Sequence, residues 1–253
     1  MRLSVIVPVW QDSNALQELL AVLAQQLAPH PLLAEQIEVV VVQTEDTADA
    51  SSDLFRPLAN GPTHTPDLTD PGGFALTRLL APRGRGRQMD AGAQAARGDW
   101  LWFLHVDSKV PVAAFEFLCS QLPPGWGRFD VRLDVDTAAA KLIAAAMNLR
   151  SRLTGICTGD QGMFVHRSLL DRVGGVPRQP LMEDVELSRR LRRLCRPLSP
   201  RIVLITSARR WVRDGMLRTI LGMWVFRLRY WSGADPDVLA RDYYRNARVT
   251  DDL

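Results

Sequence analysis

The segment Trp100-Leu101-Trp102-Phe103-Leu104-His105-Val106-Asp107-Ser108 places a wholly apolar run directly before a histidine, an aspartate and a serine. An apolar run without interruption is typical of a strand that is buried on both faces, as inside a parallel sheet. In open α/β sheets, ligands bind beyond the carboxyl ends of the strands. We therefore expect Asp107 at the rim of a cleft, where its carboxylate needs water, a cation or a metal. The plainer alternative is that Asp107 only begins a turn.

Strand-like and helix-like segments alternate on both sides of this run, which predicts βαβ units on a mainly parallel sheet. Strands are expected at residues 3–9, 37–42, 74–81, 99–106, 127–133 and 162–166. Helices are expected after a cap at Ser13, at 85–96 and 111–121, after a cap at Thr137, from Glu183, and at 215–231. The helix after Thr137 carries Leu142, Ala146, Leu149 and Leu153 on one face, and residues 56–73 are expected to form a loop. The sequence thus predicts a single α/β domain whose central sheet is flanked by helices.

Composition narrows the class of protein further. The 253 residues are 47% hydrophobic and 23% charged, as in an ordinary globular protein with a sizeable core. The three cysteines (Cys119, Cys157 and Cys195) are far apart and show no zinc spacing, which indicates buried thiols in a reducing compartment. The sequence shows neither a signal-peptide core nor an apolar run long enough to span a membrane. We therefore expect a cytoplasmic protein.

Arginines gather in three places, at residues 83–87, 189–193 and 209–213. A guanidinium group presents paired donors that match phosphate oxygens. Because no nucleic-acid recognition motif accompanies the arginines, we expect a discrete phosphate ligand rather than a nucleic acid. The stretch Pro82-Arg83-Gly84-Arg85-Gly86-Arg87-Gln88 follows a predicted strand and opens a predicted helix, whose N-terminus favours anions. The alternative for this stretch is a basic surface turn.

Acidic residues open the helix that is expected from Glu183. Glu183, Asp184 and Glu186 all lie in its first turn, where acids commonly complement the helix dipole. Pro177 and Pro180 precede them and fix the loop that presents the pair. A carboxylate held in this way can accept a proton from a sugar hydroxyl as a general base.

The predicted helix at residues 215–231 is apolar on two sides. One face carries Leu217, Ile220, Leu221, Trp224, Leu228 and Trp231, and the opposite face carries Met223, Phe226 and Tyr230. A helix of this kind needs two partners. One partner is the domain core, and the other is more of the same fold, a second copy in a homodimer, or a membrane surface contacted peripherally.

Short motifs follow one another in a fixed order along the chain. They are Pro8-Val9, the Arg83–Arg87 loop, Phe103–Asp107, Gly159-Asp160-Gln161, Gly174-Gly175, Glu183-Asp184 and Arg210-Trp211. Over roughly residues 2 to 245, this ordered set resembles the family 2 glycosyltransferases of the GT-A fold. Four stretches resemble most closely a bacterial subfamily linked to arsenosugar biosynthesis: Leu104–Ser108, Thr158–Gln161, Pro180–Leu191 and Thr206–Trp211.

The resemblance implies a Rossmann-like GT-A domain with C-terminal helices and a role for individual residues. Residues 1–110 would form the nucleotide-sugar-binding half, and residues 111–253 the acceptor and catalytic half. Asp107 and His105 would hold Mg²⁺ or Mn²⁺ against the donor diphosphate, and Asp184, beside Glu183, would deprotonate the acceptor. The other implied contacts are Pro8, Gln43, Arg83, Arg87 and Arg210 on the nucleotide side, and Asp160, Gln161 and Trp211 on the acceptor side.

The implied reaction is metal-dependent transfer of a hexose-like sugar with inversion. The donor is a nucleoside-diphosphate sugar, with a UDP-sugar as the first choice, and the acceptor is a small-molecule or lipid-linked hydroxyl. The leaving diphosphate gathers negative charge, which a metal and arginines stabilise where it develops. A base on the opposite side of the sugar carbon favours in-line displacement.

Two alternatives to this enzyme stay open. The family usually carries an aspartate directly after the second strand, whereas this chain has Gln43 at that place. The first alternative is therefore a non-catalytic nucleotide-binding or scaffold protein of the same fold. The second is a sugar-nucleotide pyrophosphorylase, which needs a loop rich in glycine and arginine after the first strand, where Pro8-Val9-Trp10 offers none.

Overall fold

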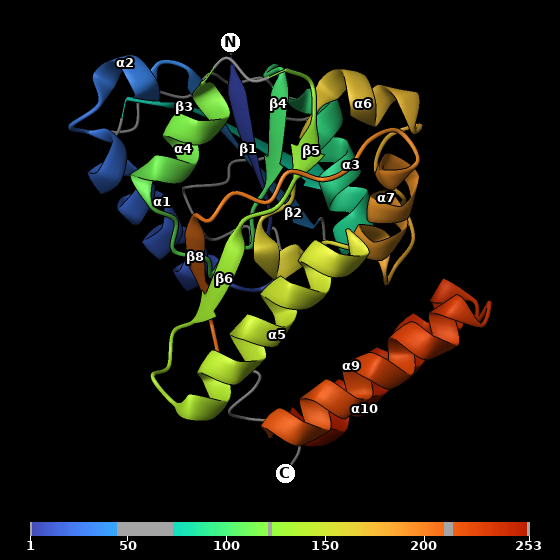
Figure 1. Ribbon diagram of the computed structural model, residues 1–253. Helices are drawn as coiled ribbons and strands as arrows, with labels where there is room; N and C mark the ends of the chain where they lie inside the picture. Colours follow the sequence, from blue (N-terminus) through green and yellow to red (C-terminus); the bar gives the residue numbers. More distant parts are fainter. Residues whose placement is uncertain (1, 45–72, 121–122, 210–214, 252–253) are drawn as a thin grey trace.

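The computed structural model describes residues 2–44, 73–120, 123–209 and 215–251, so the expected loop at 56–73 lies almost wholly outside the described residues. A central six-stranded sheet has the strand order β3-β2-β1-β4-β7-β5 (Figure 1). Its strands are β1 (Leu3–Pro8), β2 (Ile37–Thr44), β3 (Ala75–Ala81), β4 (Trp100–Phe103), β5 (Trp126–Gly127) and β7 (Phe164–His166). A separate parallel pair consists of β6 (Asp130–Leu133) and β8 (Val203–Thr206).

Helices cover both faces of the central sheet (Figure 1). One face carries α1 (Ser13–Leu27), α2 (Pro31–Ala34) and α4 (Val112–Cys119). The other face carries α3 (Arg85–Ala95), α6 (Arg167–Arg172) and α7 (Glu183–Arg192). Three further helices, α5 (Ala138–Thr154), α9 (Met216–Trp231) and α10 (Pro236–Asp251), lie at the end of the sheet opposite the N-terminus, and a short 3₁₀ helix, η2, spans Gly159–Gln161.

The sheet reverses its winding between β1 and β4. Strand β1 pairs in parallel with β2 on one side and with β4 on the other, and β3 continues the parallel part beyond β2. β7 runs antiparallel to both β4 and β5. The predicted mainly parallel sheet is therefore confirmed. The crevice beyond the carboxyl ends of β1 and β4 is the place where doubly wound sheets bind ligands.

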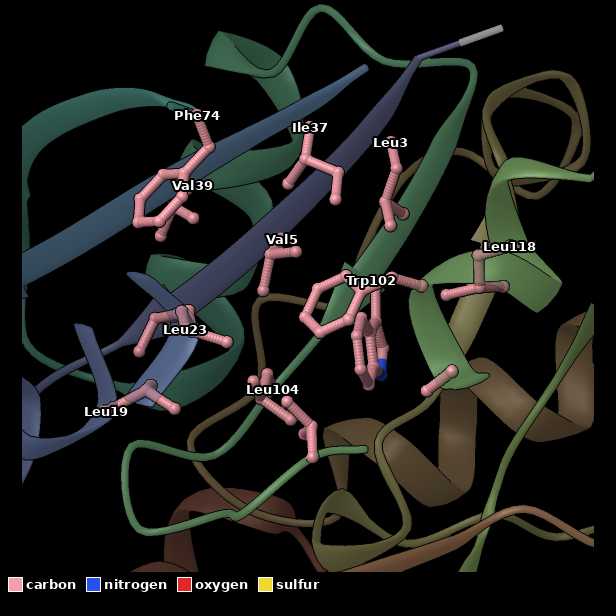
Figure 2. Packing of buried hydrophobic residues seen from close by; sticks show 14 of the residues in the cluster. Leu3, Val5, Leu19, Leu23, Ile37, Val39, Phe74, Trp102, Leu104 and Leu118 are labelled. Atoms are coloured by element: carbon pink, nitrogen blue, oxygen red, sulfur yellow. The ribbon is translucent and has the colours of Figure 1, made fainter. Parts of the chain in front are cut away.

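The core explains why the apolar runs form these strands. Every residue of β2 and β4 is buried, as expected for strands covered on both faces. Leu19 and Leu23 of α1 belong to the same buried cluster as Leu3 and Val5 of β1 (Figure 2). Trp102 packs edge-on against neighbouring phenylalanines, and its indole N–H donates a hydrogen bond to the carbonyl of Gly162 at 3.1 Å. This bond ties the chain around η2 to the strand that leads to Asp107.

Several predicted elements differ from the structure. The single strand expected at 127–133 is wrong, because its two ends pair with β7 and β8 in different sheets. The strand expected at 99–106 ends as a paired strand at Phe103. Asp12, rather than Ser13, caps α1 by accepting a hydrogen bond from the amide of Ala15. The sequence analysis did not predict β8, α2, α6 or α10.

Helix α5 begins after the predicted Thr137 cap, but its leucine face is turned outward. Leu142 and Leu153 are 71% and 77% exposed, and the buried residues are Ala140, Ile143, Ala144 and Ser151. Small side chains let α5 approach β6 closely. The strongest apolar stripe of this helix therefore does not face the core.

Helix α9 has two different faces, as predicted. Its inner face packs against the start of α7, where Phe226 and Tyr230 contact the cluster around Met182 and Val185. On its outer face, Leu221, Trp224, Leu228 and Trp231 are about half exposed or more, as is the adjacent Val225. Within the described residues, the expectation that the fold itself covers this outer face is wrong.

Two further expectations concern the compartment. Cys157 is buried, Cys119 and Cys195 are half-buried, and all three are free thiols. Across the described parts of the chain, no helix has both the length and the apolar character needed to span a membrane.

Candidate active site

A cavity of about 960 Å³ lies beyond the carboxyl end of β4. Its wall is built from the loop after β4, η2, the start of α7, the end of β8, and the inner sides of α9 and α10. Both pairs of residues that the sequence analysis singled out, His105 with Asp107 and Glu183 with Asp184, line this one cavity. The fold thus brings together two motifs that are far apart in the chain.

Asp107 and His105 form the first pair. Nδ1 of His105 lies 2.5 Å from a carboxylate oxygen of Asp107, and both side chains are partly exposed at the cavity. Partial burial acts to raise the pKa of Asp107, but the hydrogen bond from His105 and the positive charges of His105 and Arg209 lower it overall. Asp107 is therefore a stable carboxylate at the rim of the cavity.

This pair supplies few donors for a metal. Within the described residues, no group of three or more histidine, cysteine, aspartate or glutamate side chains is placed to hold a metal ion. Mg²⁺ is commonly held by one or two carboxylates together with the phosphates of a substrate. The donor set of Asp107 and His105 fits a cation that is shared with a bound diphosphate, rather than one held by the protein alone.

Glu183, in the second pair, is committed to an arginine. Nη1 of Arg85 donates to a carboxylate oxygen of Glu183 at 2.9 Å, and Glu183 is buried. Burial and the neighbouring Asp184 raise the pKa of Glu183 to about 7, whereas Arg85 opposes this shift. The acidic residues around Arg85 in turn hold its pKa above the ordinary value, although burial opposes them. The Glu183 carboxylate therefore holds the guanidinium group of Arg85 in place through this ion pair.

Asp184 differs from Glu183 because no ion pair with a described residue occupies its carboxylate. One oxygen accepts a hydrogen bond from the amide of Gly159 at 2.9 Å, and the other accepts from the amide of Val185 at 2.7 Å. These bonds fix the carboxylate at the cavity wall while leaving lone pairs for a further donor. Of the two acids, Asp184 is the one placed to accept a proton.

The glycines of the Arg-Gly-Arg loop act through packing. A Cβ on Gly86 would lie 2.4 Å from the carbonyl oxygen of Pro177, so only glycine lets α3 begin directly against the loop that leads into α7. A Cβ on Gly159 would lie 2.1 Å from the guanidinium of Arg85, which covers this turn. The backbone of Gly86 therefore lies against the loop before α7, and the backbone of Gly159 lies against Arg85.

The structure places the other predicted site residues unevenly. Asp160 lines the cavity, whereas Gln161, also predicted on the acceptor side, is fully buried, does not line it, and donates to the hydroxyl of Ser151 at 2.9 Å. Four residues predicted on the nucleotide side do not line the cavity: Pro8 at the end of β1, Gln43 buried in β2, and Arg83 and Arg87, both exposed. Arg210 and Trp211 lie outside the described residues.

Sequence reasoning missed four charged residues of the cavity, namely Arg85, Asp134, Arg209 and Arg227. Asp134 follows a strand in the same way as Asp107, so the strand-ending carboxylate was a usable signal. Arg227 interrupts the apolar inner face of α9, which is a second usable signal. Nothing in the sequence separates Arg85 from Arg83 and Arg87, because only the packing of α3 against α7 selects it.

Known proteins resemble this chain both in sequence and in fold. Residues 4–119, slightly less than half of the chain, match a family model described as Glycosyl transferase family 2. No curated protein matches the sequence. Among solved structures, the mannosyltransferase PcManGT from Pyrobaculum calidifontis, in complex with GDP-Man and Mn²⁺, aligns with a TM-score of 0.55 at 21% identity. That alignment covers 81% of this chain and 56% of PcManGT.

A second solved structure agrees with the first. S. aureus TarS 1-349 in complex with UDP-GlcNAc aligns with a TM-score of 0.54 at 16% identity, over 82% of this chain and 58% of TarS 1-349. The chain thus spans little more than half the length of the solved structures it matches. At these identities the likeness shows the fold, and the predicted GT-A-type domain with a mostly parallel sheet is confirmed.

Proposed function

From the family 2 glycosyltransferase match in the first half of the chain and from its GT-A-type fold, we propose that the protein transfers a sugar from a nucleoside-diphosphate sugar to an acceptor hydroxyl, with inversion. One observation carries the proposal: Asp107 and Asp184 line a single cavity at the carboxyl end of the sheet. A group that anchors the donor diphosphate and a group that accepts the acceptor's proton are the two requirements of such a transfer.

Asp184 is the general base in this proposal. Its carboxylate is held by two backbone amides and is free of ion pairs with described residues, so it can take the proton of the attacking hydroxyl. Glu183 supports it indirectly by holding Arg85, whose guanidinium covers Gly159. A positioned base contributes about 10²–10⁴-fold to the rate.

Asp107, with His105 beside it, receives the donor diphosphate. These two residues would hold Mg²⁺ or Mn²⁺, and the cation would neutralise the charge that gathers on the leaving diphosphate. Arg209, whose positive charge reaches Asp107, stabilises the same charge from the protein side. The Mn²⁺ and nucleotide sugars bound by the two similar structures support this assignment, and a UDP-sugar is the first donor to test.

The two halves of the chain take different parts in the reaction. We assign residues 1–110 to the nucleotide sugar and residues 111–253 to the acceptor and the base, in agreement with a family match that ends at residue 119. The resemblance to the subfamily linked to arsenosugar biosynthesis includes the stretches around Asp160 and Asp184. We therefore propose membership of that subfamily, with a small-molecule or lipid-linked acceptor.

A non-catalytic nucleotide-binding protein is the second candidate. The observation that favours it is Gln43, a buried residue at the position where the resemblance leads one to expect an acid. Such a protein would bind a nucleoside diphosphate at Asp107 without transferring a sugar.

A screen of nucleotide sugars tests the proposed function. The thermal midpoint of the protein is measured with UDP- and GDP-sugars, with and without Mn²⁺, and with uridine as the matched control that lacks a diphosphate. We expect a rise with at least one nucleotide sugar that depends on Mn²⁺, and none with uridine. The transfer of the sugar is then followed by NMR. A product with inverted anomeric configuration distinguishes the enzyme from the non-catalytic binder. The absence of any diphosphate-dependent rise contradicts both candidates.

We further propose that the outer face of α9 contacts a membrane surface or a second copy of the chain. An exposed face of leucines and tryptophans on an amphipathic helix is typical of both kinds of contact. We expect the protein to float with liposomes or to elute as a dimer, and the variant Trp224→Ser/Trp231→Ser to lose that behaviour. Leu32→Ser, which changes an exposed leucine on α2, is the matched control. A monomer that does not float contradicts the proposal.

A further inference from the structure

Two arginines, one of which lines the cavity, have buried donors without a hydrogen-bond partner among the described residues. Arg150 comes from α5 and Arg227 from α9, and Arg227 lines the cavity. Nη2 of Arg150 and Nε of Arg227 are both buried, and neither atom has a hydrogen-bond partner. Within the described residues, neither guanidinium forms an ion pair. Arg85 and Arg128 also have a buried Nε without a partner, but each of them pairs with a carboxylate through another nitrogen.

The two guanidinium groups are close enough to affect each other. Burial and the positive charge of Arg227 together lower the pKa of Arg150 to about 10. A buried donor without a partner destabilises the protein, and more so when it is charged. An anion that accepts hydrogen bonds from both guanidinium groups would stabilise these two like charges.

The neighbouring carboxylates do not fill this role. Burial lowers the pKa of Arg227, and the negative charges of Asp184 and Asp160 oppose this shift. Both acids also line the cavity, but neither forms an ion pair with Arg227 within 4 Å. Asp184 instead accepts hydrogen bonds from the amides of Gly159 and Val185. The arginines therefore stand beside the proposed base without being neutralised by direct contact.

This place differs from the diphosphate site. The charges that shift the pKa of Asp107 are those of His105 and Arg209, whereas Asp184 affects both Arg150 and Arg227. Arg227 lines the cavity together with Asp160 and Asp184, so we assign the two guanidinium groups to the acceptor side.

We propose that Arg150 and Arg227 bind an anionic group, a phosphate or a carboxylate, that the acceptor carries close to its reacting hydroxyl. The inference rests on the proposed function and specifies its acceptor class. Guanidinium forks bind such groups through paired hydrogen bonds. An acceptor anchored in this way presents its hydroxyl to Asp184 in a fixed orientation, which lowers the entropy cost of the reaction.

Anion binding to the donor-loaded protein tests the proposal. The protein is saturated with UDP and Mn²⁺, so that the diphosphate site is filled, and inorganic phosphate is then titrated by calorimetry. We expect wild-type protein to bind phosphate, and Arg150→Met/Arg227→Met to bind it at least about 10-fold more weakly, since the charge-assisted hydrogen bonds of both guanidinium groups are lost. Arg227→Lys should give an intermediate affinity because it keeps the charge and loses the fork. Arg241→Met, an exposed arginine on α10, is the matched control.

Two further measurements distinguish an acceptor site from a site that binds only free phosphate. Glycerol 3-phosphate should bind at least as well as inorganic phosphate, and glycerol should not bind; a site that accepts only free phosphate contradicts an acceptor site. Unchanged phosphate affinity in the double variant overturns the proposal, as does the absence of phosphate binding to protein that holds UDP. If UDP itself does not bind, the proposed function fails. Phosphate binding to the free protein, compared between wild type and double variant, then still decides whether the arginine site exists.

Discussion

Replacement of Asp184 by asparagine is expected to lower sugar transfer by about 10²–10⁴-fold, the usual contribution of a positioned general base. Asparagine has nearly the same shape and keeps an oxygen for the amide of Gly159, which donates to Asp184 at 2.9 Å. It has no carboxylate to take a proton from the acceptor. The measurement is the rate of transfer at saturating donor, once the donor screen has identified one.

The matched control for this variant is Asp171→Asn, which changes an exposed aspartate on α6 outside the cavity. It should leave the rate unchanged. Because the acceptor need not bind less tightly to Asp184→Asn, the loss should appear in kcat with little change in KM. Full turnover by Asp184→Asn would show that Asp184 is not the general base. It would not support the non-catalytic alternative, because the protein would still transfer the sugar.

The Asp107→Asn variant is expected to lose the effect of Mn²⁺ on nucleotide binding. The carboxylate of Asp107 is ionised and partly exposed at the cavity, and among the described residues His105 lies beside it as a second ligand for a cation. An amide in its place is a weaker ligand for a hard cation. Loss of several kcal/mol of charge stabilisation on the leaving diphosphate corresponds to a rate lower by about 10²-fold or more.

UDP affinity measured with increasing Mn²⁺ checks this prediction. Wild-type protein should bind UDP more tightly as Mn²⁺ rises, and Asp107→Asn should show a flat response. Asp136→Asn is the control, because Asp136 is a highly exposed aspartate whose contact is an ion pair with Lys141. Nucleotide binding and transfer that ignore Mn²⁺ in the wild type would take the metal role away from Asp107.

The strands that the sequence analysis predicted best are those buried on both faces. β4 is a continuous apolar run and β1 and β2 are mostly apolar, so local sequence is sufficient to mark them as strands. β5, β6 and β8 are short, and their assignment depends on partners far away in the chain. The leucine face of α5 was misleading for a related reason. Periodicity shows that a helix has an apolar side, but the approach of a neighbouring strand decides which side is buried.

The candidate site likewise has residues that were predictable from the sequence and residues that were not. The type and the spacing of residues identified Asp107 at the end of an apolar strand and Asp184 in the first turn of a helix. Arg85 could not be distinguished from Arg83 and Arg87, since its selection depends on the contact of Gly86 with the loop before α7. Gln161 was assigned to the cavity, although its side chain turns inward to Ser151. Backbone position was predictable in these motifs, and side-chain direction was not.

Local chemistry alone thus determined that this chain forms an α/β sheet and that carboxylates stand at the ends of its elements, because strand burial and helix capping depend on neighbouring residues. Only the tertiary structure decided that Asp107 and Asp184 share one cavity, that Arg85 is paired with Glu183, and that buried donors of Arg150 and Arg227 have no partner among the described residues. Each of these facts depends on contacts between residues that are far apart in the chain. Such contacts are set by the packing of whole helices against the sheet, which no short stretch of sequence encodes.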